Sequence, residues 1–318
     1  MRKWTLLLVM TLFPHLAGSG TVASSEAAES PKRINKAIEL LERGQPIYYT
    51  GGHGGYEEGR KLARTWADYI NYEMEHGSYD VTALRRFMQG LVDGGPTPSG
   101  HRTPAVICTL PVGGIDEATM KANYWMVQQV LATGVHGILL CHARTPGAVR
   151  VLVQAARYPF HRQGVGSALE EGLRGSGGQG YASQIWGVRG GRYLELADPW
   201  PLNPQGEILL GLKVEDRHAL INAEGSIQVP GVGFAEWGPS DMRFSLRATK
   251  LPGEEISKRL QAARQRVFAA CKSAGVAFLN GVRPDTVIAM IDEGVMIGSG
   301  GQEAAEKGRK YTKRKMPW

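Results

Sequence analysis

The sequence has few cysteines, and it has no long hydrophobic run beyond its first residues. Cys108, Cys141 and Cys271 are the only three among 318 residues, and no two have the CxxC spacing of a zinc knuckle or a thioredoxin motif. Three thiols cannot all pair within one chain, so we predict that they are buried as small hydrophobic side chains. No later segment is apolar over the roughly 20 residues that a membrane helix needs.

The N-terminus is the apolar exception. Met1-Arg2-Lys3 is positively charged, residues 5–16 are mostly apolar, and small residues follow over residues 17–25. This order is typical of a secretory signal peptide, although a structural first helix is an alternative. We predict that residues 1–28 are a signal peptide and that residues 29–318 form one domain. The mature protein is then expected in the periplasm, without a membrane association.

The charge is basic, with a formal net value of +7 and a pI of about 9.3. Such a balance admits a nucleic-acid binder, but the basic residues are spread along the chain. We therefore predict no nucleic-acid partner, and a basic surface that steers an anionic small molecule. The densest basic cluster is expected to be a solvated tail, made of Lys307, Arg309, Lys310, Lys313, Arg314 and Lys315.

Short β-like runs alternate with segments of helical period from residue 45 onward. Runs such as Ile138-Leu139-Leu140 are apolar throughout, which is typical of strands buried on both faces of a parallel sheet. Eight such strands alternating with helices predict an α/β fold of the (β/α)8 TIM-barrel type. The expected strands are Pro46–Thr50, Ala67–Glu75, Ala105–Leu110, Gly137–His142, Ile208–Glu215, Gly233–Trp237, Val276–Asn280 and Gly294–Gly298. The expected helices include Asp80–Asp93, Ala118–Thr133, Gly147–Tyr158, Glu254–Ala274 and Gln302–Tyr311.

Polar residues gather where the predicted strands end, which is where barrel enzymes carry their chemistry. Carboxylates from adjacent strands, with a histidine from another, suit a hard divalent cation. The candidates are Glu73, Glu75 and His76 after the second strand, His142 and Arg144 after the fourth, Glu215 and Asp216 after the fifth, and Asp241 after the sixth.

Four motifs together resemble the HpcH/HpaI aldolase family, the class II pyruvate aldolases related to the citrate lyase β-subunit. Residues 238–241 (GPSD) resemble its Gly-Pro-Ala-Asp element, and residues 213–217 (KVEDR) its Gln-Ile-Glu-Thr-Arg strand end. Residues 157–159 (RYP) with 164–168 (GVGSA) resemble its Arg-Tyr-Pro-Pro and Gly-Val-Gly-Ser signature, and residues 74–76 (MEH) its Gly-Glu-His. The motifs follow the family order over about residues 33–300, so the resemblance implies a barrel of the phosphoenolpyruvate/pyruvate-domain type.

The resemblance also implies a divalent cation, Mg2+, Mn2+ or Co2+, held by Glu215 and Asp241. A cation there would act as a Lewis acid on a bound keto acid and stabilise the enolate left by carbon–carbon cleavage. His76 would be the base on the aldol hydroxyl, oriented by Glu75. The turn Gly238-Pro239-Ser240 would receive the substrate carboxylate, and Gly166 and Ser167 would also belong to the substrate site.

Purely structural roles are also open for these residues. Glu215 could be an ion-pair partner under the rim, Asp241 could cap a helix, and His76 could be a packed rim histidine. The family also has an arginine at the end of its third strand, where Ile107 stands in this chain. We expect Lys213 or Arg144 to replace that positive charge.

The segment Phe160–Gln205 interrupts the barrel pattern, with a helix expected around Tyr181–Leu196. Its Trp186, Tyr193 and Trp200 are expected either to line a pocket at the rim or to pack in a subunit interface. The family commonly builds hexamers by exchanging its last helix, so we expect a homo-oligomer, a trimer or a hexamer.

These observations favour an aldehyde-lyase that makes or cleaves a hydroxy-keto acid, with a small carbonyl or carboxylate compound as its partner. Two alternatives remain. One is a metal-dependent hydratase or isomerase acting on a substrate other than pyruvate, which Ile107 favours. The other is a non-catalytic carboxylate-binding protein, which would not need the base His76.

Overall fold

Strands of parallel direction close into a barrel in the computed structural model, which describes residues 33–317. The predicted signal peptide at residues 1–28 lies outside the described residues. Neighbouring strands pair in the order β4-β3-β2-β1-β9-β8-β7-β6, and a pairing of β4 with β6 closes the ring. The barrel strands are β1 (Ile47–Gly52), β2 (Tyr69–Glu73), β3 (Ala105–Gly113), β4 (Gly137–Cys141), β6 (Ile208–Val214), β7 (Phe234–Trp237), β8 (Ala277–Gly281) and β9 (Ile297–Ser299). The predicted TIM barrel is confirmed.

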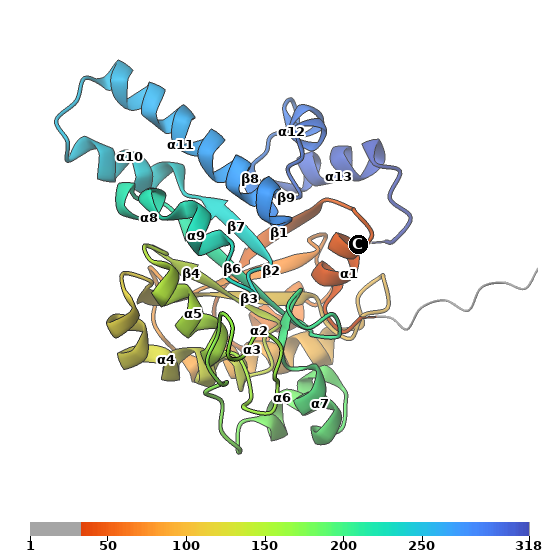
Figure 1. Ribbon diagram of the computed structural model, residues 1–318. Helices are drawn as coiled ribbons and strands as arrows, with labels where there is room; N and C mark the ends of the chain where they lie inside the picture. Colours follow the sequence, from red (N-terminus) through yellow and green to blue (C-terminus); the bar gives the residue numbers. More distant parts are fainter. Residues whose placement is uncertain (1–32, 318) are drawn as a thin grey trace, which may run out of the picture. The chain divides into compact units, whose positions relative to one another are not determined.

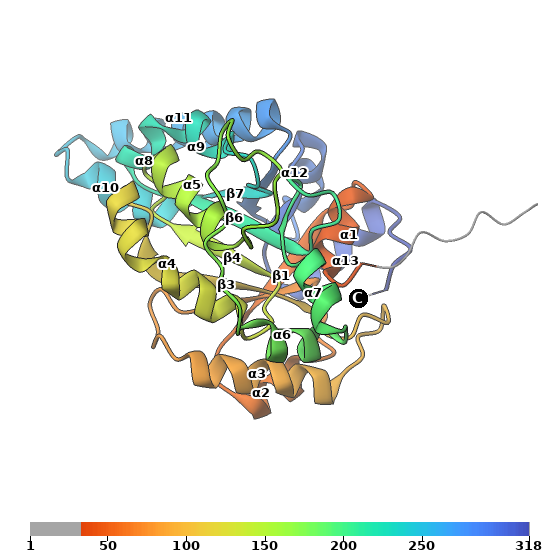
Figure 2. The same cartoon turned by 60° about the horizontal axis from the view of Figure 1, so that its bottom comes forward.

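Helices surround the strands, and the hairpin of α10 and α11 projects beyond the barrel (Figures 1 and 2). Several of these helices begin at side chains that accept N–H groups of the first turn, such as Asp80, Asp116 and Thr145. The helices are α1 (Lys36–Glu42), α2 (Tyr56–Leu62), α3 (Val81–Gly94), α4 (Glu117–Leu131), α5 (Pro146–Ala155), α6 (Gln179–Trp186), α7 (Gly190–Leu196), α8 (Arg217–Ile221), α9 (Ala223–Ile227), α10 (Pro239–Arg247), α11 (Gly253–Ala274), α12 (Val287–Glu293) and α13 (Gln302–Tyr311). Within the described range, none of them has the length and apolar character that a membrane crossing requires.

An apolar plug fills the barrel interior at the end where the strands begin, and α1 covers it. Phe234 is fully buried there and lies over Gly211 of the neighbouring strand, where a Cβ would overlap its ring. Large and small residues therefore alternate to fill the barrel. The members of the plug are Ala37, Ile38, Leu40, Ile47, Tyr69, Ala105, Ile107, Leu139, Leu209, Phe234, Leu279 and Ile297.

The segment at residues 160–205 folds at the end of the barrel where the strands begin. Its short strand β5 (Pro199–Trp200) pairs with the first residues of β6, and Gly187, at φ 71°, separates the expected helix into α6 and α7. Trp186 donates from Nε1 to the Gly134 carbonyl at 2.8 Å, and Tyr193 is fully buried. The expectation of a rim pocket or a subunit interface is therefore wrong for these two aromatic residues, which pack in the core of their own chain.

The basic tail is not wholly solvated, contrary to the prediction. The side chains of Arg309 and Arg314 are 1% exposed and surround the buried Asp68 carboxylate together with Lys36. Removing a carboxylate from water is costly unless cations pair with it, and three cations from the two ends of the described chain do so here. The prediction for the cysteines is confirmed, because all three are buried and free.

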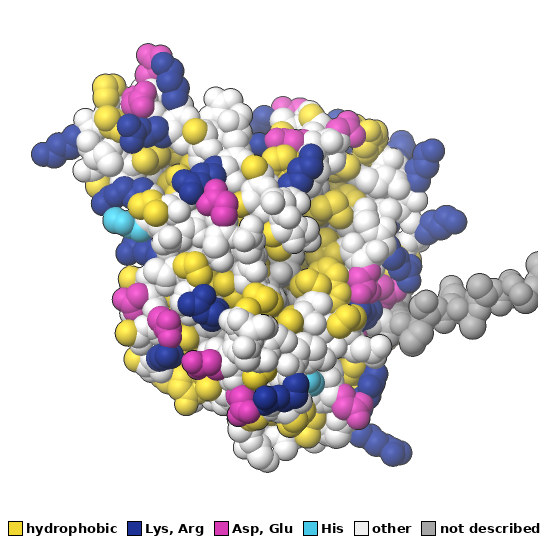
Figure 3. All heavy atoms as spheres, viewed as in Figure 1, with side chains coloured by type: hydrophobic (Ala, Val, Ile, Leu, Met, Phe, Trp, Pro, Cys, Tyr) yellow, Lys and Arg dark blue, Asp and Glu magenta, His cyan; other side chains and the backbone are white. Residues whose placement is uncertain are grey.

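The outer surface carries mixed charge. On the face drawn in Figure 3, Lys and Arg side chains are interspersed with Asp and Glu, and several gather over the α10–α11 hairpin. The exposed residues of that hairpin include Arg243, Arg247 and Lys250. The basic surface expected to steer an anionic small molecule stays a prediction.

Candidate active site

Charged side chains from four strands meet above the apolar plug. Side chains two residues apart on a strand share one face, so Gly211 and Lys213 of β6 and Glu215, directly after it, all point into the barrel. The register of β6 and β7 places Lys213 opposite Glu236. Glu73 and Glu75 come from the end of β2, so the interior passes from apolar to ionised within a few residues.

Lys213 is the cation at the centre of this cluster. Its Nζ lies 2.6 Å from Glu75 Oε2, and both side chains are largely buried. Burial alone lowers the pKa of Lys213, but its anionic neighbours, Glu75, Glu215 and Glu236 among them, outweigh burial and hold that pKa well above its ordinary range. Lys213 is therefore permanently charged at neutral pH.

Glu75 is held in its ionised form. Burial raises its pKa, but hydrogen bonds from Cys141 and Lys213 and the charge on Lys213 bring the pKa below its ordinary value. The sequence prediction placed Glu75 beside His76, and the structure adds its ion pair with Lys213. Glu75 thus lies between His76 at the rim and Lys213 in the barrel interior.

Glu215 is 1% exposed, at the point where β6 ends. Its Oε1 accepts a hydrogen bond of 2.8 Å from the backbone N–H of His142. Burial raises its pKa, and Lys213 partly offsets that effect. A Cβ at Gly238 would overlap Glu215, so this glycine is required by the close approach of Glu215.

Glu236 was not singled out from the sequence. Its pKa is raised to about 7, chiefly by burial and partly offset by Lys213. A carboxylate with such a pKa changes its charge near neutral pH and is a candidate proton carrier. One signal in the sequence could have found it: Glu236 interrupts an otherwise apolar strand and shares a face with Phe234.

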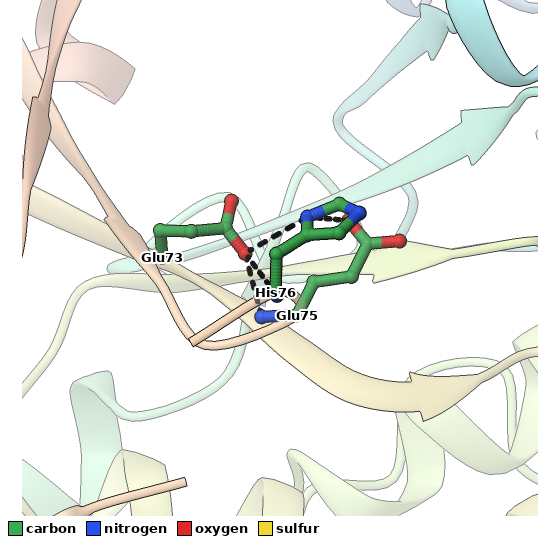
Figure 4. Close-up of side chains that lie close together, drawn as sticks. All are labelled: Glu73, Glu75 and His76. Carbon is green, nitrogen blue, oxygen red and sulfur yellow. Dashed lines mark hydrogen bonds and ion pairs between the residues drawn. The ribbon is translucent and has the colours of Figure 1, made fainter. Parts of the chain in front are cut away.

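Glu73, Glu75 and His76 form a group at the end of β2 (Figure 4). Glu73 Oε1 accepts the backbone N–H groups of Glu75 at 2.6 Å and of His76 at 3.1 Å. The imidazole Nδ1 of His76 lies 3.7 Å from Glu73 and 3.8 Å from Glu75. The His76 side chain is 71% exposed, so it is not a packed rim histidine and can reach a bound molecule.

A second histidine, His142, also lies near Glu75. His142 follows β4, and its Nδ1 lies 3.1 Å from Asp216 Oδ2, which also accepts the Nε–H of Arg144 at 2.8 Å. The hydrogen bond to Asp216 raises the pKa of His142. Arg144 is thus engaged by Asp216, whereas Lys213 points into the barrel. Two cations were expected to replace the missing positive charge. Of these, Lys213 is the one that lies among Glu75, Glu215 and Glu236.

The predicted turn at residues 238–241 leads into α10, whose first turn contains Asp241. Pro239 and Ser240 line a hollow of about 220 Å³ with Arg243, Phe244 and Arg247. Glu75, Lys213 and Glu215 do not line this hollow. The role of Asp241 as a second metal ligand stays a prediction.

Gly166 and Ser167 lie elsewhere. They line a cavity of about 650 Å³ on the outside of the barrel, between α5, α9 and the loop after residue 160. Arg150, Gln154 and Gln228 share this cavity, whereas Glu75, Lys213 and Glu215 do not line it. The structure therefore does not bring the two predicted substrate residues to the acids.

Ile107 does not stand at the end of its strand, contrary to the expectation. It is the third residue of β3, lies level with Asn71 and Gly137, and belongs to the apolar plug. The residue of β3 that lies level with Glu73 is Thr109, whose hydroxyl donates to Asn71 Oδ1 at 2.8 Å. The longer reach of β3, which continues to Gly113, explains the difference.

The family model for HpcH/HpaI aldolase/citrate lyase matches residues 60–304. A hydroxypyruvate/pyruvate aldolase of Cupriavidus necator is 27% identical over 201 residues, which cover 62% of this chain and 68% of that protein. A protein of the same description from Deinococcus radiodurans is 28% identical over 58% of this chain and 62% of its own length. A 2-keto-3-deoxy-L-rhamnonate aldolase of Klebsiella pneumoniae is 28% identical over 49% of this chain, and the match spans about half of that relative, 52%.

Solved structures share the fold. An HpcH/HpaI aldolase/citrate lyase family protein of Burkholderia cenocepacia superposes with a TM-score of 0.64 at 20% identity, over 87% of this chain and 97% of that chain. Macrophomate synthase superposes with a TM-score of 0.58 at 16% identity, over 89% of each chain. The relatives named as aldolases are carbon–carbon lyases, as predicted for this chain. The chain belongs to the HpcH/HpaI aldolase/citrate lyase family.

Proposed function

We propose that the protein is a divalent-metal-dependent aldehyde-lyase that cleaves a hydroxy-keto acid by a retro-aldol reaction through a pyruvate-type enolate. The observation that carries this proposal is the buried Glu215 carboxylate beside Lys213 and Glu75 at the strand ends. Family membership supports the reaction class. The aldolases named among the relatives make pyruvate the first compound to test.

The residues fit a divalent cation. Glu73, Glu75, Glu215 and Glu236 bring four carboxylates to one region that contains the single lysine Lys213. Such an excess of negative charge in a partly buried site is costly without a cation, and carboxylate oxygens are the ligands that Mg2+ and Mn2+ prefer. Glu215 and Asp241 would hold the cation, which when bound would polarise the keto group as a Lewis acid.

Groups of the protein would bind the substrate, accept its proton and stabilise the enolate. The backbone N–H groups at the start of α10 would bind the substrate carboxylate. His76 would accept the proton of the substrate hydroxyl as the carbon–carbon bond breaks. The electron pair of that bond enters the enolate, and the fixed charge of Lys213 stabilises it. An aldehyde leaves, and the enolate takes up a proton to give the keto acid.

One assay tests the reaction class. Purified protein with Mn2+ and pyruvate in D2O should exchange the pyruvate methyl protons, because exchange requires the enolate. Glu215→Gln should reduce the exchange at least a hundredfold, whereas Glu303→Gln, on the exposed side of α13, should not change it. Binding of Mn2+ without exchange would favour the hydratase or isomerase alternative. Neither binding nor exchange would favour a non-catalytic carboxylate-binding protein.

We also propose that the protein is exported and oligomeric. The charged, apolar and small residues of segment 1–28 support export to the periplasm. N-terminal sequencing of protein recovered from the periplasm should then begin near residue 29. The family resemblance supports a trimer or hexamer, for which light scattering of the mature protein should give three or six times the chain mass.

A further inference from the structure

His142 has an unusual backbone conformation at the rim of the barrel. Its φ of 47° lies in the left-handed region, which is unfavourable for a residue with a side chain. The backbone N–H of His142 donates to Glu215 Oε1 at 2.8 Å, which holds the residue in this conformation. The strained turn therefore places the imidazole of His142 directly beside the Glu215 carboxylate.

Asp216 fixes the orientation of the imidazole. Its Oδ1 accepts the backbone N–H groups of His218 and Ala219 at 2.8 and 2.9 Å, as the N-cap of α8. Its Oδ2 accepts from Arg144 at 2.8 Å and lies 3.1 Å from His142 Nδ1. An ionised carboxylate held in this way requires the proton on Nδ1, so the lone pair of a neutral ring lies on Nε2.

The Nε2 atom faces the cluster of acids. It lies 3.9 Å from Glu75 Oε1, and the ring Nδ1 lies 3.6 Å from Glu215 Oε1. One ligand atom from each of Glu75, His142 and Glu215 falls within 4.8 Å of the other two. Atoms bound to one cation at about 2.1 Å lie roughly 3–3.5 Å apart, so small side-chain rotations would bring these three into range.

We propose that His142 supplies an imidazole nitrogen to the divalent cation, with Asp216 as the carboxylate that orients it. The inference rests on the proposed cation at Glu215 and deepens it. A histidine that donates its other N–H to a carboxylate is the usual arrangement around protein-bound metals. The chain therefore holds its cation through mixed nitrogen and oxygen ligands.

A nitrogen ligand changes the metal preference. Imidazole suits Co2+ and Zn2+, whereas Mg2+ keeps to oxygen ligands. The wild-type protein should bind Co2+ more tightly than Mg2+, and His142 should account for that difference. Asp216→Asn should weaken Co2+ binding by about 10–100-fold, as loss of an orienting carboxylate does in other sites.

The direct test is pulsed electron paramagnetic resonance of the full chain loaded with Mn2+. Uniform labelling with 15N-histidine should replace a 14N coupling by a 15N coupling in the wild-type spectrum. His142→Gln should abolish the coupling, while His76→Gln and His218→Gln should keep it. His218 is a matched control, because it is an exposed histidine two residues from Asp216. Absence of a histidine coupling in the wild type overturns the inference without any need for a variant.

Calorimetry with Co2+ and Mg2+ gives a second readout. His142→Gln should weaken Co2+ at least tenfold and Mg2+ less than threefold. Equal losses for the two metals, or a coupling that persists in His142→Gln, would overturn the assignment. The proposed function can fail separately: a histidine coupling without pyruvate exchange leaves His142 as a ligand and refutes the lyase. Exchange without the coupling supports the lyase and refutes the ligand.

Discussion

Lys213 Nζ lies 2.6 Å from Glu75 Oε2, which joins the carboxyl end of β6 to the end of β2 across the barrel. The two residues are 138 positions apart in the chain. Their ion pair is largely buried, so removal of either partner leaves an uncompensated charge. The cation also lies among Glu215 and Glu236, which makes it the group best placed to stabilise negative charge on a substrate.

Lys213→Gln should lower the rate of pyruvate methyl exchange by about 10²–10³-fold, the usual loss for a group that stabilises a developing anion. Arg144→Gln should lower it less than tenfold, because Arg144 is paired with Asp216 at the rim. Circular dichroism would confirm that both variants are folded. Equal rates in the two variants would show that Lys213 has no special role.

Glu236→Gln should change the pH dependence of stability in protein stripped of metal. The folded-state pKa of Glu236 is about 7, above the ordinary value of 4.5. The contribution of Glu236 to the free energy of unfolding is therefore fully present below about pH 4.5, and it is lost as the pH rises through 7. Glu236 is partly solvent-exposed, so we expect a shift of only about 1–2 kcal/mol relative to the variant between pH 5 and pH 8. Urea unfolding at both pH values measures it, and a constant difference would contradict the assignment.

Asp68→Asn should destabilise the protein by roughly 3–5 kcal/mol, because it leaves the buried cations Lys36, Arg309 and Arg314 without their carboxylate. The pKa of Asp68 is lowered to about 2, since these cations outweigh its burial. Its contribution is therefore present above about pH 4 and is lost as the pH falls through 2.

The control for Asp68 is Asp285→Asn, because Asp285 pairs with Arg283 on the surface. Exposed pairs contribute little, so this variant should unfold at the same urea concentration as the wild type. A similar loss in both variants would mean that the cluster around Asp68 does not hold the C-terminal tail in place.

Two glycines of the barrel should respond differently to alanine. In Gly238→Ala the new Cβ overlaps Glu215, so Co2+ affinity should fall at least tenfold while the fold remains. In Gly211→Ala it overlaps the ring of Phe234 in the apolar plug, which should cost about 1–3 kcal/mol of stability and leave Co2+ affinity unchanged. Calorimetry and urea unfolding on both variants separate the effects, and the same phenotype for both would contradict the division of the barrel into plug and site.

The sequence by itself determined the strands and their order. Short β-like runs, several of them apolar throughout, predicted each of the eight barrel strands, and the periodic helices were found with small errors at their ends. The final helix has the predicted bounds, Gln302–Tyr311. Short helices such as α8, α9 and α12 were missed, because five to seven residues contain too few turns for a period to show.

Only the tertiary structure decided which residues share a level of the barrel. Strand alternation tells which side chains face inward, but it does not tell how far neighbouring strands are displaced along one another. That displacement put Ile107 in the plug and Thr109 beside Glu73, and it brought Lys213 to Glu75 and His142 to Asp216. Register in a closed barrel is a property of all the strands together, which is why acids such as Glu75 and Glu215 could be predicted from the sequence and their partners could not.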